Sequence, residues 1–431
     1  MKKGQWPIDQ EFDEDFANKL AQLESHNKHI YRPNTYLHKW WARRCGTTFR
    51  LILKQLVADS DKRDFYKSGG LSGKVVFDPM MGGGTTLHEA VRLEANVIGN
   101  DIDPMPFLQA RATLTPIELD LLRINFAELH EFISLELRPL FQTNCPSCDL
   151  DVDLQFMLYG LFQECSCVGG IYLDSFKLRT QPDGTQLVIC SRCHYVGTEK
   201  EEHRCSSGLR KTPIYLKGSK NCPICGGTFQ QNLLKPYYTR YKPVAVACRC
   251  LRHGFQLAAV SQRDMELLQQ ADHTRSLLIP ENTLDVGDGP KTKALLRKGI
   301  HHYEDLFSSR QIIYITRASK LTSKFDELIG LNLGLLVSTS LDLNSMLCGY
   351  KGTAVRRAGA VRHVFSHHAY SFPHTALENN PIYPAKISGS LKRLFSDRIE
   401  RGKKWSLEPR ERVVDKTGIK FIQINGELDL G

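Results

Sequence analysis

The stretch GKVVFDPMMGGGTTLHEA, residues 73–90, decides the predicted fold. Its apolar run ends abruptly at Asp78 and Pro79, passes three glycines and continues in a helix-like pattern. Three glycines directly after a strand allow left-handed backbone angles and let a ligand approach the main chain closely. We therefore predict a buried strand over residues 74–78, a glycine turn, and a helix over residues 84–95.

The segment NVIGNDIDP, residues 96–104, predicts a second strand after this helix. A strand, a helix and a strand within roughly thirty residues form the smallest unit of a parallel sheet. The sequence therefore indicates the α/β class. A long helix is expected to follow, within residues 115–141, and to lead away from this unit.

Two aspartates flank the predicted turn. Asp78 ends the first strand, where a carboxylate can accept from a ligand's amino group, and Asp101 follows the second strand, where an acid can bind ribose hydroxyls. The hydroxyls of Thr85 and Thr86 can cap the helix, whose first N–H groups would face an anionic group. An amino group, a carboxylate and a ribose together describe S-adenosylmethionine. The alternative is a structural turn without a ligand.

Two other glycine-rich motifs fit this turn poorly. A Walker-type phosphate loop needs a lysine after the last glycine, and no lysine follows Gly84. A dinucleotide fingerprint needs G-x-G-x-x-G, whereas Met81 here precedes three consecutive glycines.

The motif DPMMGGGTT, residues 78–86, resembles the D-P-F-x-G-x-G-T-T motif of DNA amino-methyltransferases, which methylate an exocyclic nitrogen of adenine or cytosine. YRPNTYLHKWWARR, residues 31–44, resembles the segment before this motif in adenine-specific DNA methylases that carry a zinc ribbon. The likeness is discontinuous over about residues 28–385 and implies a Rossmann-like, doubly wound methyltransferase core with an inserted zinc-ribbon module. The expected cofactor-binding residues are Lys39, Trp40, Asp78, Pro79, Met80, Gly82, Gly83, Gly84, Thr85, Thr86, Asp101 and Ile102.

Eleven of the 13 cysteines lie between residues 145 and 250, mostly in close pairs. A C-x-x-C turn presents two thiolates to one tetrahedral ion, so two pairs complete a structural zinc site. Redox chemistry is the alternative, but it needs one motif opening a helix rather than several pairs among turns. The expected ligands are Cys145, Cys148, Cys165, Cys167, Cys190, Cys193, Cys222, Cys225, Cys248 and Cys250, with His203 and Cys205 as a further possible pair.

These pairs predict two or three zinc ions, and which cysteines share an ion stays open. The resemblance implies one ribbon built from the first and last C-x-x-C pairs, Cys145/Cys148 and Cys222/Cys225. The interval has too few apolar residues to fold well without metal, so zinc binding should supply much of its folding free energy.

The resemblance also implies an Asp/Asn-Pro-Pro-Tyr/Phe tetrapeptide that binds the amino group of the target base. The chain has no Pro-Pro dipeptide among its 19 prolines. The nearest match is NPIY, residues 380–383, which we interpret as an ordinary loop because no apolar strand is expected before it. Either a second polypeptide supplies the tetrapeptide, or the chain has lost catalysis and retains cofactor or DNA binding.

Three regions are predicted: 1–142 with the cofactor-binding unit, a cysteine-rich insertion over 143–255, and a helical, basic region over 256–431 that ends on a core strand. The 57 basic and 47 acidic residues give a net charge of +10, which permits DNA binding. The start lacks the apolar core of a signal peptide and no apolar stretch is long enough to span a bilayer, so we expect a cytoplasmic protein without a membrane partner.

The expected function is the cofactor-binding part of an S-adenosylmethionine-dependent DNA methyltransferase, acting on adenine N6 or cytosine N4 with a second subunit. The alternative is a non-catalytic, zinc-containing DNA-binding or scaffold subunit of a restriction or phage-defence complex.

Overall fold

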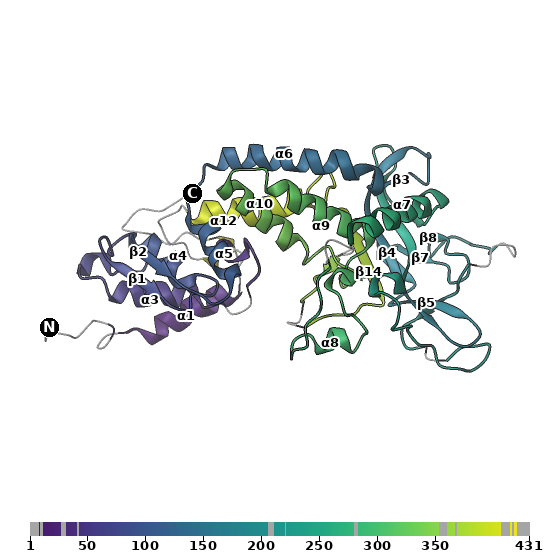
Figure 1. Ribbon diagram of the computed structural model, residues 1–431, viewed down its shortest axis with the longest axis horizontal. Helices are drawn as coiled ribbons and strands as arrows, with labels where there is room; N and C mark the ends of the chain where they lie inside the picture. Colours follow the sequence, from purple (N-terminus) through teal and green to yellow (C-terminus); the bar gives the residue numbers. More distant parts are fainter. Residues whose placement is uncertain are drawn as a thin grey trace. The chain divides into compact units, whose positions relative to one another are not determined.

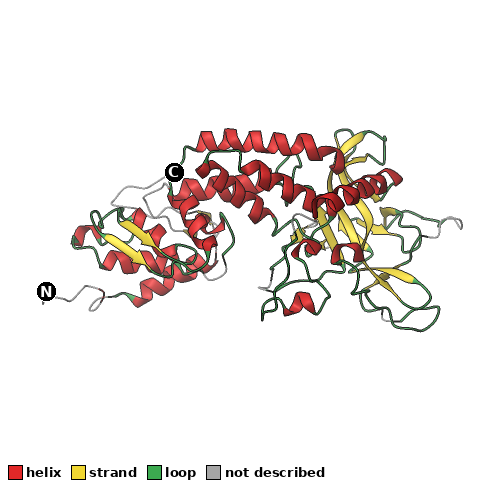
Figure 2. Ribbon diagram, viewed as in Figure 1, coloured by secondary structure: helices red, strands yellow, loops and turns green. Residues whose placement is uncertain are grey.

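The computed structural model describes residues 8, 12–26, 32–40, 43–205, 211–219, 221–279, 283–352, 360–366, 369–406, 414–415 and 418–419. The chain divides into two compact units (Figure 1). Unit 1 comprises residues 1–128, 322–339 and 394–431, and unit 2 comprises residues 129–321 and 340–393. Both combine helices with strands, so the chain belongs to the mixed α/β class (Figure 2).

Unit 1 is built mainly of helices around one small sheet. Its strands are β1 (Val75–Asp78) and β2 (Asn96–Gly99), and a hairpin of β15 (Val414–Asp415) and β16 (Gly418–Ile419) follows later in the chain. Its helices are α1 (Glu14–His26), η2 (Pro33–Tyr36), α3 (Gly46–Gln55), η3 (Ser60–Lys62), α4 (Thr85–Arg92), α5 (Pro104–Leu114), η8 (Phe395–Glu400) and α12 (Arg401–Ser406). The boundary between the units falls within α6 (Leu119–Leu137) and α10 (Glu327–Ser340), and at the last residue of α9 (Ser309–Thr322) and of α11 (Leu391–Leu394).

The predicted strand-helix-strand unit is confirmed. β1 and β2 pair in parallel, with Val75 opposite Asn96 and Asp78 opposite Gly99, and α4 connects them. One face of this pair packs on the core through Val76 and Val97. In the part of unit 1 that the structure describes, the parallel sheet has these two strands, so the larger doubly wound sheet remains a prediction.

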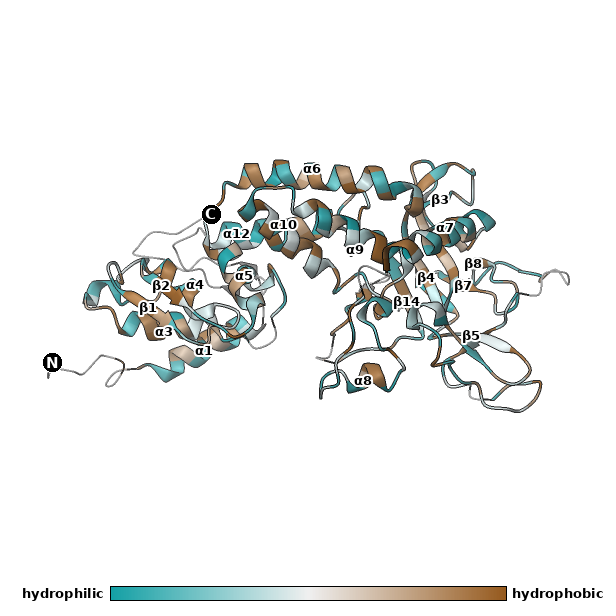
Figure 3. Cartoon of the chain, in the orientation of Figure 1, coloured by the Kyte–Doolittle hydropathy of each residue, from teal (hydrophilic) through white to brown (hydrophobic). Residues whose placement is uncertain are grey.

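The other face of the β1–β2 pair is exposed, although the sequence predicted a buried strand. Val75 and Phe77 on β1 are 61% and 59% exposed, and Ile98, opposite Phe77 on β2, is 55% exposed. Both strands are largely apolar in Figure 3. A strand with an apolar outer face has the same sequence pattern whether another element covers that face or not. The sequence alone therefore could not show that this face is exposed.

Unit 2 is organised around a nine-stranded sheet with the order β11-β10-β4-β14-β12-β13. Its long strand β4 (Asp151–Glu164) pairs antiparallel with β10 (Tyr241–Cys250) on one side and with β14 (Thr375–Asn379) on the other. The remaining strands of the sheet are β3 (Gln142–Asn144), β5 (Gly169–Leu173), β9 (Ile214–Leu216), β11 (Gly254–Ala259), β12 (Gly349–Lys351) and β13 (Ala360–Arg362). Its buried core includes Leu158, Val244 and Leu377 from the three central strands.

A separate three-stranded sheet joins β6 (Lys177–Thr180), β7 (Gln186–Ile189) and β8 (Val196–Thr198). The helices of unit 2 are η4 (Arg138–Phe141), η5 (Tyr237–Arg240), α7 (Gln262–Leu278), α8 (Lys293–Leu296), η7 (Tyr303–Leu306), α9 (Ser309–Thr322) and α11 (Leu391–Leu394). The cysteine-rich interval 143–255 therefore lies within one folded unit together with helices that the sequence assigned to a third region.

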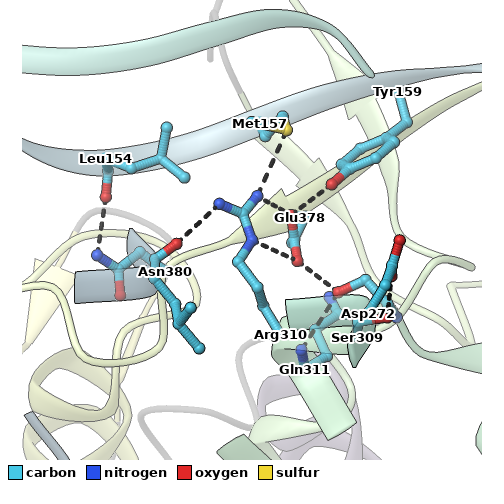
Figure 4. Close-up of polar contacts among 11 residues, drawn as sticks. Leu154, Met157, Tyr159, Asp272, Ser309, Arg310, Gln311, Glu378 and Asn380 are labelled. Carbon is cyan, nitrogen blue, oxygen red and sulfur yellow. Dashed lines mark hydrogen bonds and ion pairs between the residues drawn. The ribbon is translucent and has the colours of Figure 1, made fainter. Parts of the chain in front are cut away.

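A buried ion pair ties α9 to the central sheet (Figure 4). The guanidinium of Arg310 contacts the carboxylate of Glu378 on β14, and both side chains are at most 2% exposed. The hydroxyls of Tyr159 and Ser308 also donate to Glu378, while Arg310 donates to the carbonyl of Leu140. Because the donors and acceptors are matched, we interpret this network as structural.

The tetrapeptide NPIY follows β14 directly, a strand of mixed polarity (TALEN) that the sequence did not predict. All five residues of β14 are buried. Asn380 is 2% exposed, its Nδ2 donates to the Leu154 carbonyl at 2.8 Å (Figure 4), and its Oδ1 accepts from Ile382 N–H at 3.0 Å. A side-chain amide that both donates to and accepts from the main chain stabilises a turn, which agrees with the interpretation of NPIY as an ordinary loop.

The strand predicted over the last ten or so residues lies outside the described residues. Within the described ranges, every helix is too short or too polar to cross a lipid bilayer.

Candidate metal centres and the glycine turn

Three four-residue clusters in unit 2 are arranged so that each can hold a metal ion, and all thirteen cysteines are free of disulfides. The first cluster is Cys145, Cys148, Cys250 and His253. The second is Cys165, Cys167, Cys222 and Cys225. The third is Cys190, Cys193, His203 and Cys205.

The separations between ligand atoms match tetrahedral coordination. Two thiolates at about 2.3 Å from one tetrahedral ion lie about 3.8 Å apart. All ligand atoms of a cluster lie within 4.8 Å of one another, and the nearest sulfur atoms are closer, as between Cys148 and Cys250 at 3.8 Å, Cys167 and Cys222 at 3.6 Å, and Cys190 and Cys205 at 3.2 Å. The histidines also fit, because Nδ1 of His253 lies 3.6 Å from Cys250 Sγ and Nε2 of His203 lies 3.0 Å from Cys193 Sγ.

The three C-x-x-C segments fold in the same way. In each, a residue with a left-handed backbone follows the second cysteine: Asp149 at φ 57°, His194 at φ 64° and Gly226 at φ 71°. Its N–H donates to the carbonyl of the first cysteine at 2.8 to 3.0 Å. The N–H of each first cysteine donates in turn to a carbonyl five residues on, that of Leu150, Tyr195 or Gly227, at 2.8 Å. This tight knuckle points both thiols to one side.

At Cys250, main-chain donors favour the thiolate form that binds metal. The N–H groups of Arg252 and His253 stabilise the charged sulfur of Cys250 and lower its pKa to about 6. The first cluster is the least exposed of the three, since Cys145 and Cys250 are both buried.

The clusters differ from the sequence prediction in three respects. Cys248 is not a member: it lies on β10 with 1% exposure, and burial raises its pKa to about 12. His253 completes the first cluster instead, from the turn between β10 and β11. The pairs Cys145/Cys148 and Cys222/Cys225, which the resemblance joined in one ribbon, belong to different clusters.

His253 was missed although a local signal existed. Cys250 and His253 form a C-x-x-H spacing, which presents two ligands as C-x-x-C does. The C-x-C spacing proved ambiguous, because Cys165 and Cys167 both join a cluster whereas Cys248 does not.

In unit 1, the glycine turn and the segment after β2 form one hydrogen-bonded structure. Gly82 and Gly84 have left-handed φ values of 49° and 75°. Oδ2 of Asp101 accepts from Gly82 N–H at 2.8 Å, and its Oδ1 accepts from Asp103 N–H at 3.1 Å. These N–H groups lower the pKa of Asp101, so it is a carboxylate at neutral pH. Asp101 thus bridges the ends of the two parallel strands.

Asp78 lies at the same edge of the sheet. It ends β1 and its Oδ1 accepts from Met80 N–H at 3.2 Å. Two apolar side chains beside the carboxylates are strongly exposed, Met80 at 83% and Ile102 at 102%. Pro79 is exposed as well, and its carbonyl accepts from the Asn100 side chain at 3.4 Å. Two acids and two bare apolar groups therefore surround the turn.

The two threonines do not cap the following helix, contrary to the prediction. α4 begins at Thr85, its N-cap is Gly84, and no side chain makes the capping bond. Thr85 and Thr86 are the first two residues of the helix itself. A left-handed glycine can end the turn without a side chain, which leaves both hydroxyls for other contacts.

The segment before the glycine motif lies against the turn. A Cβ placed on Gly83 would lie 3.3 Å from Cδ1 of Trp40 and 3.5 Å from Cγ of Arg43. The buried indole N–H of Trp40 has no hydrogen-bond partner among the described residues. Lys39 is half-buried next to it. Arg43 Nε donates to the Trp40 carbonyl at 3.0 Å and holds this segment in place.

Arg43 and His88 are neighbours of the turn that the sequence did not single out. Burial lowers the pKa of Arg43 to about 9, and it also lowers the pKa of His88 to about 3, so this imidazole is neutral. Both lie close to the turn, within 3.5 Å of a Cβ placed on Gly83 or Gly84.

Comparison of the chain with protein-family models, curated proteins and solved structures found no match. The assignment of a function therefore depends on the residues described above.

The clusters predict three metal ions per chain, each with four ligands. Cys222→Ser should leave two ions and destabilise unit 2 by well over the typical cost of a substitution, about 1 kcal/mol, because a structural ion supplies folding free energy. Metal analysis of the purified protein together with thermal unfolding measures both effects. Cys248→Ser is the matched control and should retain three ions, since Cys248 lies outside the clusters. Loss of an ion from this control, or its retention in Cys222→Ser, would contradict the assignment.

Proposed function

We propose that this chain is the cofactor-binding part of an S-adenosylmethionine-dependent DNA amino-methyltransferase that a second polypeptide completes. The observation that carries the proposal is the hydrogen bond between Asp101 and Gly82, which joins the acid after β2 to the glycine turn after β1. This bond makes the turn and the acid a single site at the carboxyl end of two parallel strands, where α/β sheets bind nucleosides.

The residues at this site fit the parts of S-adenosylmethionine. A carboxylate has about four acceptor positions, so Asp101 can bind ribose hydroxyls while it holds Gly82 and Asp103. Asp78 can accept from the amino group, and the unpartnered indole N–H of Trp40 can donate to the carboxylate. The exposed Met80 and Ile102 offer apolar contacts for the adenine ring. The bound cofactor would supply a methyl group carried on a positively charged sulfur.

Among the residues that the structure describes, the tetrapeptide most similar to the catalytic motif does not offer the acceptor that the target amino group needs. Transfer to an exocyclic nitrogen requires a flipped base and an oxygen acceptor beside that nitrogen. The closest tetrapeptide, NPIY, is buried and its asparagine is committed to Leu154 and Ile382. Because the side-chain amide of Asn380 is already hydrogen-bonded to the main chain, we infer that another polypeptide supplies the catalytic tetrapeptide.

The open sheet of unit 1 supports the same conclusion. Parallel sheets occur almost entirely with both faces covered, whereas Val75, Phe77 and Ile98 leave one face of the β1–β2 pair open. A two-stranded sheet is also marginal by itself. We infer that the second polypeptide covers this face and extends the sheet.

Zinc is the proposed ion in the three clusters. Sets of thiolates with at most one imidazole, in tetrahedral arrangement, are typical of structural zinc. Each cluster uses all four positions for protein ligands, so none leaves an open position for chemistry on a substrate. The zinc sites are therefore proposed to stabilise the fold of unit 2.

Replacing Asp101 with Asn should weaken S-adenosylmethionine binding by at least about tenfold, because a charged acceptor contributes roughly 1.5–3 kcal/mol per hydrogen bond. Isothermal calorimetry on the metal-loaded chain measures this, alone and with the second polypeptide. Asp120→Asn removes the same charge from an exposed position on α6 and should change the affinity less than twofold. Absence of affinity in the unaltered chain under both conditions would reject cofactor binding.

Replacing Phe77 with Asp should weaken association with the second polypeptide by at least tenfold, since it places a charge on an apolar contact surface. The second polypeptide for this measurement is expected from a neighbouring reading frame, and it is identified by an Asp/Asn-Pro-Pro-Tyr/Phe tetrapeptide after an apolar strand. Phe77→Leu preserves the apolar surface and should bind within about twofold of the unaltered chain. Equal binding by all three proteins would show that this face is not the interface.

The contrasting function is a zinc-containing DNA-binding scaffold without catalysis. It is favoured by the three metal clusters and a cationic cavity in unit 2, which do not involve the glycine turn. DNA binding without any S-adenosylmethionine affinity would identify this function.

A further inference from the structure

Unit 2 contains a cavity of about 500 Å³ that none of the metal clusters contributes to. Residues after β5, the start of β6, the β12–β13 pair and the segment before β14 line it. This volume falls within the range of sites that bind small molecules or parts of larger ones, about 300–1,000 Å³.

The cavity is strongly cationic. Four basic side chains line it, from Lys177, Lys217, Lys351 and Arg362. The one carboxylate, Asp174, is already engaged: its Oδ1 lies 3.0 Å from Lys217 Nζ and its Oδ2 accepts from Thr375 N–H at 3.1 Å. Lys177 lies 3.8 Å from Glu199. An excess of positive charge therefore remains for an anionic ligand.

Two of the cations lie close together on one hairpin face. β12 and β13 pair antiparallel with Gly349 opposite Arg362 and Lys351 opposite Ala360. Lys351 and Arg362 are therefore diagonal neighbours on the same face, about 7–8 Å apart at the backbone. Neither makes an ion pair with a residue that the structure describes. Their spacing suits a phosphate held from two sides.

The same cavity has an aromatic wall. Phe372 is half-buried and lines the cavity with Pro373 and Tyr350. Its ring packs edge-to-face with Tyr237, with ring centroids 6.0 Å apart, and Nζ of Lys298 lies 5.7 Å from the ring centroid. A ring held next to phosphate-binding cations is the combination by which proteins bind unpaired nucleotides. An inorganic anion could be bound by the charged side chains alone, without an aromatic ring.

We propose that this cavity binds one nucleotide of single-stranded DNA, with the phosphate held by Lys351 and Arg362 and the base stacked on Phe372. The choice of DNA as the ligand rests on the proposed function, whereas the nucleotide chemistry rests on the cavity alone. An extruded or single-stranded segment beside the target base is the natural source of such a nucleotide.

Fluorescence anisotropy with a short single-stranded oligonucleotide tests this site on the full, metal-loaded chain. The Lys351→Ala/Arg362→Ala variant should raise Kd at least tenfold at about 0.1 M salt and reduce the salt slope by about 0.7 for each phosphate that it no longer neutralises. Lys291→Ala/Lys293→Ala removes the same charge from exposed positions of unit 2 outside the cavity and should raise Kd less than threefold. Equal weakening in the two double variants would overturn the proposal.

Phe372→Leu keeps the charge and should still raise Kd at least roughly fivefold, because stacking on a base contributes about 1–3 kcal/mol. Deoxyadenosine monophosphate should displace the oligonucleotide, and an equal concentration of inorganic phosphate or of an acidic peptide should not. An unchanged Kd in Phe372→Leu, or equal displacement by phosphate or by the peptide, would overturn the proposal. S-adenosylmethionine affinity, measured on the same variants, should not change. If none of these proteins, including the unaltered chain, bound S-adenosylmethionine, the methyltransferase function would be rejected, but the nucleotide site would not be contradicted.

Discussion

Clusters that can each hold a metal ion lie at both ends of the central strand of unit 2, and we infer that this constraint organises the fold of the unit. Cys145 and Cys148 immediately precede β4, and Cys165 and Cys167 immediately follow it. The first pair is joined to the β10–β11 turn through Cys250 and His253, and the second is joined to a distant knuckle at Cys222 and Cys225. An ion bound at each end would supply folding free energy where β4 begins and ends. Four strands of the sheet pair directly with β4, namely β3, β5, β10 and β14 with Glu378, and the others are attached through these.

Unit 1 presents a different situation, with a well-formed turn on a parallel sheet that has two strands in the part of the unit that the structure describes. The turn is held by local bonds, from Gly82 to Asp101 and from Met81 N–H to the Asn100 carbonyl at 3.0 Å. Its geometry therefore does not need further strands. The apolar face of the same two strands does need a cover, because Phe77 and Ile98 lie open side by side. Both the self-contained turn and the open apolar face would be explained if this chain holds the whole cofactor site and a second polypeptide completes the catalytic site.

Local patterns in the sequence were sufficient where local bonds determine the structure. The strand-helix-strand unit follows from an apolar run, glycines and a helical period within thirty residues, and the C-x-x-C knuckles follow from a spacing that closes on itself. Longer-range features were not accessible in this way. Which knuckle shares an ion with Cys145 depends on how β10 returns to β4, and the burial of Cys248 depends on the same pairing. Thr85 does not cap the helix because Gly84, with its left-handed backbone, occupies the N-cap position. The strand before Asn380 forms because its residues pair with β4.

In the proposed function, unit 1 binds the nucleoside cofactor. Unit 2, whose fold the metal clusters are proposed to stabilise, contacts nucleic acid through a separate cavity. Photochemical labelling with S-adenosylmethionine radiolabelled on its methyl group tests the proposed site in unit 1. We expect saturable incorporation that excess unlabelled cofactor abolishes, with the label in peptides that span Trp40 or residues 78–102. Labelling that does not saturate, or that falls only on peptides of unit 2, would show that unit 1 does not hold the cofactor.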